Sequence, residues 1–111
     1  MEDRDITQEE YVRRVLDAYR STPGTAGTVR RADRLLAVHL WERAVPLLVI
    51  ENALILAAAR RLLRPADAAP LNIVRSLAYF VPVIEEVAEL RVSPDYYIYL
   101  RQKIRRQTQA R

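Results

Sequence analysis

Cysteine is absent from this chain of 111 residues, and histidine occurs once, as His39. Without cysteine the chain has no disulfide framework and no thiolate metal site. A single histidine also excludes a zinc or iron centre built from several histidines. His39 has no serine or aspartate at a spacing that indicates a catalytic triad, so we expect it to pack in the core. We therefore predict a protein that is not an enzyme, has no catalytic residues and needs no metal or cofactor.

Long apolar runs are also missing. The most apolar stretch, residues 46–59, is about 14 residues long and contains Glu51 and Asn52. A membrane-spanning helix needs about 20 apolar residues, so we expect this stretch to be a core helix. The first twenty residues are acidic and amphipathic, unlike a signal peptide. We therefore expect a soluble, cytoplasmic protein without a membrane partner.

Glycine is scarce, with Gly24 and Gly27 as its only occurrences. The rest of the chain is rich in leucine, alanine, arginine and glutamate, which favour helix. A chain of this length has room for one domain with one hydrophobic core. The sequence therefore predicts a single all-α domain over residues 1–111, folded as a compact bundle of about five helices.

Start and stop signals divide the chain into these helices. A capping box at Thr7 and Glu10 begins the first helix, and Pro46 and Pro94 occupy positions where helices often begin. Ser93, directly before Pro94, is the expected cap of the last helix. Pro82 lies inside the fourth helix and predicts a kink or break there, with a restart near Val81. The expected helices run from residue 7 to the turn signals at 21–24, then over 29–43, 46–63, 71–90 and 94–108, with a six-residue linker at 65–70.

Apolar positions predict how the second and third helices are oriented. The third helix is apolar on nearly all sides, which is typical of a central helix. Glu51 interrupts it, and a buried carboxylate without a partner is strongly disfavoured. We therefore predict a structural ion pair between Glu51 and either Arg34 or Arg75. In the second helix, apolar residues at helical spacing predict the core-facing side: Ala32, Leu35, Leu36, His39 and Leu40.

The charge balance is basic, with a formal net charge of +4 and Lys103 as the lone lysine. Arginine binds phosphate and carboxylate groups through its planar fork, although an arginine excess also accompanies a GC-rich genome. Arg30 and Arg31 follow a loop at the expected start of the second helix. Free N–H groups and the positive end of the helix dipole favour an anion there, such as a DNA phosphate. The alternative is a loop that only caps the helix.

The last helix carries the most informative pattern. Residues 93–111 hold five basic groups and one acidic group. One side of this helix is an apolar stripe of Tyr96, Tyr97, Leu100 and Ile104, and the remainder carries the candidate nucleic-acid-binding residues Tyr99, Arg101, Lys103, Arg105 and Arg106. Basic side chains with an interleaved aromatic ring are suited to sequence-independent phosphate binding with base stacking. The alternative is a solvated terminal helix that docks by its tyrosines.

Residues 28–61 and 70–86, which include the stretches RSLAYF and PVIEE, resemble a group of short, uncharacterised bacterial helical proteins. That group is associated with mobile elements and replication modules, so the resemblance implies a bacterial setting and a role near DNA. It carries over no activity and no site residues. Our leading hypothesis is a nucleic-acid-binding accessory protein. The alternative is an interaction adaptor or homodimeric subunit that binds through residues 77–83 or the tyrosines of the last helix.

Overall fold

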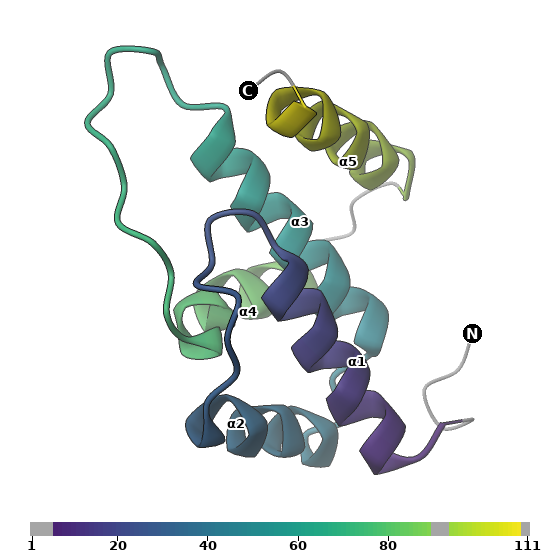
Figure 1. Cartoon of the computed structure of the whole chain (residues 1–111). Coiled ribbons are helices and arrows are strands. Elements are labelled where there is room, and N and C mark those ends of the chain that lie inside the picture. The colour runs from purple at the N-terminus through teal and green to yellow at the C-terminus, as the bar shows by residue number, and fades with distance from the viewer. Residues whose placement is uncertain (1–5, 90–93, 110–111) are drawn as a thin grey trace.

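A computed structural model describes residues 6–89 and 94–109 of the chain (Figure 1). Within these ranges the elements are α1 (Gln8–Ser21), α2 (Arg31–Glu42), α3 (Leu47–Leu62), the short 3-10 helix η2 (Leu77–Phe80), α4 (Val81–Glu89) and α5 (Pro94–Gln109). The predicted all-α bundle of about five helices is confirmed. The Ser93 side chain, which the sequence suggests as a cap for α5, lies outside the described residues.

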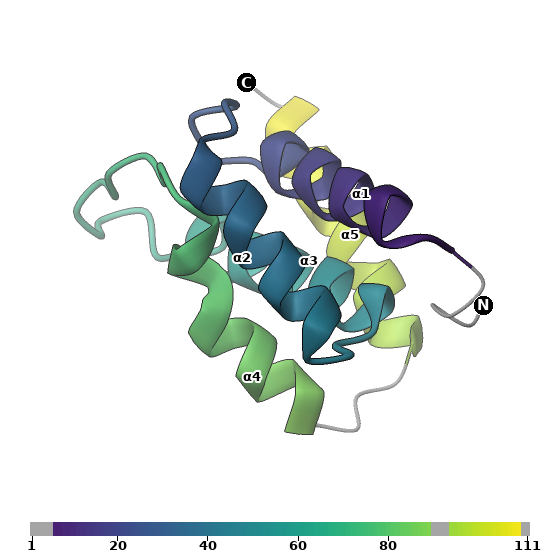
Figure 2. The ribbon, with the colours of Figure 1, turned by 90° about the horizontal axis from the view of Figure 1, so that it is seen from below.

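Helix α3 forms the centre of the bundle. It packs against α1, α4 and α5, and Figure 2 shows it behind α2 and between α4 and α5. Its buried residues are Leu47, Ile50, Ala53, Leu54, Leu56, Ala57, Ala58 and Ala59. Four of these are alanines, whose small side chains let neighbouring helices approach closely. The central position predicted from its apolar composition is confirmed.

Helix α1 begins at the predicted cap. The Thr7 hydroxyl oxygen accepts a hydrogen bond from the Glu10 N–H at 3.1 Å. The helix then buries one side of its surface, including Tyr11, Val15 and Tyr19. The Tyr11 hydroxyl donates to the Val45 carbonyl oxygen at 2.6 Å, so α1 holds the turn that joins α2 to α3.

That turn ends α2 with a Schellman motif. The Val45 N–H donates to the Leu40 carbonyl oxygen at 3.1 Å, and the Ala44 N–H donates to the Trp41 carbonyl oxygen at 2.9 Å. Ala44 takes the left-handed position, with φ of 59°, where glycine is more common. The sharp reversal places Pro46 as the N-cap residue of α3.

Helix α2 is rotated from the orientation that its apolar residues predict. Its buried residues are Asp33, Ala37 and Leu40, whereas Leu35 and His39 are exposed. Of the predicted stripe only Leu40 is fully buried, so the prediction of a packed His39 is wrong. The reason lies in a carboxylate that faces the core.

Asp33 is 2% exposed and joins two segments that are distant in sequence. One of its carboxylate oxygens accepts from the Arg30 N–H at 2.9 Å, and the other accepts from the Leu77 N–H at 2.9 Å. The side chain thus caps its own helix and also holds the start of η2. Both contacts require Asp33 to point inward, and they rotate α2 away from its most apolar side.

The connection after α3 is longer than the predicted linker at residues 65–70. Residues 63–76 form no helix, so the expectation of a helix from residue 71 is wrong. The backbone of this loop pairs instead with the loop after α1. The Val74 N–H donates to the Gly24 carbonyl oxygen, and the Ala26 N–H donates to the Val74 carbonyl oxygen, both at 2.8 Å. These bonds satisfy backbone groups that a helix would otherwise pair internally.

Pro82 sits in the first turn of α4, where it interrupts no helical hydrogen bond. The preceding residues form η2, and the α-helix begins at Val81. The predicted break and restart near Val81 is confirmed.

Replacement of Asp33 by alanine should lower the free energy of unfolding by about 2–4 kcal/mol, because two backbone N–H groups lose their acceptor. Urea denaturation followed by circular dichroism measures this change. The control is His39→Ala on the exposed side of the same helix, which should change stability by less than about 0.5 kcal/mol. Equal stability of the two variants would contradict the role given to Asp33.

Candidate nucleic-acid interface on helix α5

Helix α5 is anchored by one side. Tyr97, Leu100 and Ile104 are buried, and the helix packs along α3. Burial raises the pKa of Tyr97 above its ordinary value. Tyr96 departs from the predicted stripe, because 44% of its surface is exposed. Three of the four predicted anchors therefore face the core, and the opposite side of the helix faces solvent.

The cations of α5 lie on that outer side. Arg101, Arg105 and Arg106 are exposed, and none forms an ion pair with an acid in residues 6–89 or 94–109. Lys103 contacts Tyr99 in two ways: its ammonium group donates to the hydroxyl oxygen at 3.3 Å and lies 5.6 Å from the ring centroid. The positive charge of this helix is thus available to an external anion.

Helical spacing divides these residues between two flanks of α5. One flank carries Ile98, Arg101 and Arg105. The other flank carries Tyr99, Lys103 and Arg106. Together with Gln107, these residues line a shallow hollow of about 390 Å³. Tyr99 is 48% exposed and lies in this hollow between cations. An exposed ring flanked by positive charge offers both base stacking and phosphate contact.

Four arginines elsewhere in the bundle are paired with the protein's own carboxylates. Arg60 on α3 forms a two-pronged pair with Glu86 on α4, with nitrogen–oxygen distances of 2.8 and 2.5 Å. Arg43 pairs with Glu85 at 2.8 Å. On α1, Arg13 pairs with Glu10 and Arg20 pairs with Asp17. An external anion would have to compete with these carboxylates for the same guanidinium groups.

Two further arginines at the end of α3 hold the long loop at residues 63–76. Arg61 donates to the Asn72 carbonyl oxygen at 2.7 Å and to the Tyr79 hydroxyl at 3.2 Å, with its guanidinium 5.6 Å from the Tyr79 ring centroid. Arg64 donates to the Ala69 carbonyl oxygen at 2.8 Å. The basic end of α3 is therefore structural.

Arg30 and Arg31 are both exposed at the start of α2, as the sequence predicts for an anion site. The Asp33 carboxylate, however, already accepts from the first free N–H group of this helix. Figure 1 shows α2 and α5 at opposite ends of the molecule, so the two predicted basic groups do not form one surface. The interface on α5 is the stronger candidate because its cations form no ion pair with a carboxylate of the described residues.

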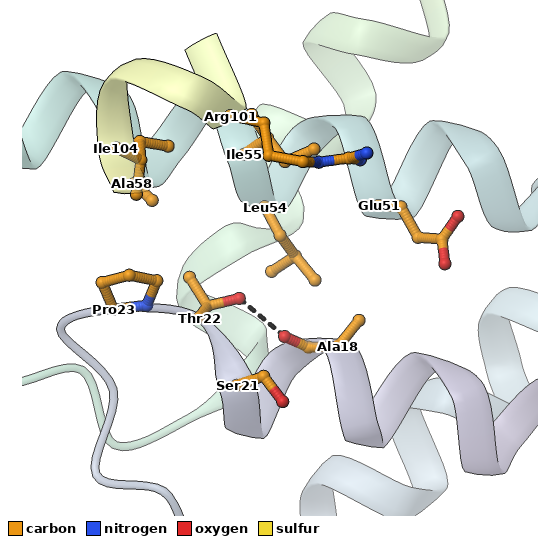
Figure 3. Close-up of a pocket in the computed structure, with 10 residues that line it drawn as sticks. All are labelled: Ala18, Ser21, Thr22, Pro23, Glu51, Leu54, Ile55, Ala58, Arg101 and Ile104. Carbon is orange, nitrogen blue, oxygen red and sulfur yellow. Dashed lines mark hydrogen bonds between the residues drawn. The ribbon is translucent and has the colours of Figure 1, made fainter. Parts of the chain in front are cut away.

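Glu51 does not form the predicted ion pair with Arg34 or Arg75 within the described residues. The prediction assumed full burial, but Glu51 is only partly buried. It opens onto a cavity that it shares with Arg101, as Figure 3 shows. Arg34 lines a different groove, between α1 and α2, and Arg75 is an exposed residue of the loop before η2. Sequence reasoning did not find the shared cavity, because Glu51 and Arg101 are brought together only by tertiary packing.

Residues 6–89 and 94–109 contain no group of three or more histidine, aspartate or glutamate side chains that is arranged to hold a metal ion. Over the same residues, no helix combines the length and the apolar character that crossing a bilayer requires.

The Arg60–Glu86 pair should make stability depend on pH. Hydrogen bonding to Arg60, with its positive charge, lowers the pKa of Glu86 below the ordinary value of 4.5. A lowered folded-state pKa contributes stability that is present above the unfolded-state value and is lost as pH falls through the folded-state value. Below about pH 4.5 the melting temperature of the wild type should fall more steeply than that of Glu86→Gln. Thermal melts over this range test the difference, with Glu89→Gln as the control that should follow the wild type.

Comparison with known proteins does not assign the chain to a family. No protein-family model matches the chain, and no curated protein and no solved structure matches it either. The resemblance to short bacterial proteins of mobile elements therefore stays a prediction, and the functional argument rests on the geometry of α5.

Proposed function

We propose that this protein is a non-enzymatic accessory protein that binds nucleic acid through the solvent-facing cations of α5. A cytoplasmic, mobile-element or replication setting, which the sequence resemblance implies, belongs to the same proposal. The observation that carries it is that α5 gathers three exposed arginines and Lys103 on one helix, and that none of them has an acidic partner in the described residues.

The arrangement favours phosphate contact without base reading. Arg105 and Arg106 are adjacent in sequence and therefore project about 100° apart around the helix, so they reach different phosphates. Tyr99 offers a ring on which a base stacks irrespective of its identity. Sequence-specific recognition, which needs side chains held against base edges, is not part of the proposal.

Replacement of Arg105 and Arg106 together by glutamine should weaken duplex DNA binding without lowering the melting temperature. Each lost phosphate contact should reduce the slope of log affinity against log salt by about 0.9, so the double variant should bind with a slope less steep by about 1.8. Fluorescence anisotropy with labelled duplex at several salt concentrations measures both quantities.

The matched control is the double variant Arg13→Gln and Arg20→Gln, which removes the same charge from side chains paired on α1. It should bind DNA more tightly than the α5 variant does. No binding by the wild type at low salt, or binding that does not respond to salt, would exclude the proposal. Equal losses in the two double variants would show that net charge, and not the surface of α5, attracts the DNA.

A second candidate function is self-association through α5. Tyr96, Ile98 and Tyr99 are 44%, 52% and 48% exposed, so three large, largely apolar side chains of one helix face solvent. The other surface suggested by the sequence, residues 77–83, is less suited because Leu77 and Phe80 are buried.

Under this second candidate, light scattering should give the mass of a dimer, and Ile98→Lys should give the mass of a monomer because a charge would enter the apolar contact. The added charge would instead strengthen DNA binding under the leading proposal. A wild-type monomer at all concentrations would exclude self-association.

A further inference from the structure

A cavity of about 430 Å³ lies beside the end of α1, between α3 and α5 (Figure 3). Its walls are largely apolar and include Leu54, Ile55, Ala58 and Ile104. Sites for small molecules have volumes of roughly 300–1,000 Å³ and apolar walls with a few placed polar groups. The cavity fits this description in both size and lining.

Two opposite charges line the same cavity. Glu51 comes from α3 and Arg101 from α5, and they are not ion-paired with each other or with another described residue. The two hydroxyl groups of the lining are already used as donors, because Ser21 donates to the Asp17 carbonyl oxygen and Thr22 to the Ala18 carbonyl oxygen. The carboxylate and the guanidinium are therefore the groups that can orient a ligand.

The charges and the apolar groups occupy different parts of the cavity. Figure 3 shows Glu51 and Arg101 toward one end, and Pro23, Ala58 and Ile104 toward the other, with Leu54 between them. A ligand that fits needs an anionic group, a cationic group close to it, and an apolar body directed away from both.

We propose that this cavity binds a free α-amino acid with an apolar side chain. Arg101 donates hydrogen bonds to the α-carboxylate through its planar fork, and Glu51 accepts from the α-ammonium group. The apolar side chain passes over Leu54 toward Ala58 and Ile104. A fatty acid or a peptide C-terminus carries only the anion and would leave the Glu51 carboxylate facing a like charge.

The site is independent of the proposed nucleic-acid binding, although Arg101 belongs to both surfaces. Glu51 lies on α3, so a substitution there leaves every cation of α5 in place. Loss of amino-acid binding in a Glu51 variant and loss of DNA binding in an Arg105 and Arg106 variant therefore report on separate proposals.

Titration of the full chain with leucine, leucinamide and N-acetylleucine, followed by NMR chemical shifts, tests the site. Leucine should shift signals of the lining residues at millimolar concentrations. Leucinamide lacks the carboxylate and N-acetylleucine lacks the ammonium group, so each should bind at least about tenfold more weakly, as expected for loss of a hydrogen bond to a charged group.

Two variants test which group of the ligand contacts Glu51 and which contacts Arg101. Glu51→Gln should weaken leucine binding at least about tenfold but leave the affinity for N-acetylleucine unchanged, whereas Arg101→Gln should weaken leucine and leave leucinamide unchanged. Glu42→Gln and Arg13→Gln, which change exposed residues outside the cavity, should bind leucine as the wild type does. Thermal unfolding confirms that each variant is folded.

Absence of leucine-dependent shifts in the wild type would overturn the proposal. Equal affinities for leucine and its two analogues would also overturn it, because the charges would then play no part in recognition. A Glu51→Gln variant that binds leucine as tightly as the wild type would lead to the same conclusion.

Discussion

The fold depends on one constraint: α3 has almost no side that tolerates water. A helix of this kind is stable only when other helices cover it, since each exposed apolar side chain forgoes about 25 cal/mol for every Å² left in water. Helices α1, α4 and α5 meet this requirement along most of α3, and Leu48 in its first turn stays 63% exposed. Because α5 covers α3 with Tyr97, Leu100 and Ile104, its remaining surface must face outward. The burial of these three side chains against α3 thus determines which side of α5, with its cations, faces solvent.

The arginines of α3 and those of α5 differ in their surroundings. Those on α3, such as Arg60 and Arg61, link elements to one another through carboxylate, carbonyl and hydroxyl oxygens. Those on the outer side of α5, such as Arg105, have no such partner within the described residues. A net charge of +4 gives no information about this division. The distinction matters because a guanidinium that already binds a carboxylate gains less from a phosphate.

Local signals made much of the fold predictable from sequence. The Thr7 cap, Pro46 and Pro94 each act within a few residues, so the starts of three helices follow from the sequence around them. The stripe of α5 was predictable for the same reason. Asp33 was not, because its inward orientation depends on the Leu77 N–H, 44 positions away. The cavity that Glu51 shares with Arg101 and the extended path of residues 63–76 were missed likewise, since both are set by tertiary contacts and not by periodicity.

The loop at residues 63–76 has a consequence for how the sequence can diverge. Arg61 and Arg64 hold it through carbonyl oxygens of Asn72 and Ala69, and such atoms belong to every amino acid. The hydrogen bonds from Arg61 and Arg64 therefore depend on the position of the main chain and not on the side chains of Asn72 and Ala69. Related chains should show rapid drift at the exposed positions of this segment while keeping the two guanidinium groups and the buried Val74, and a peptide tag inserted near its tip should be tolerated.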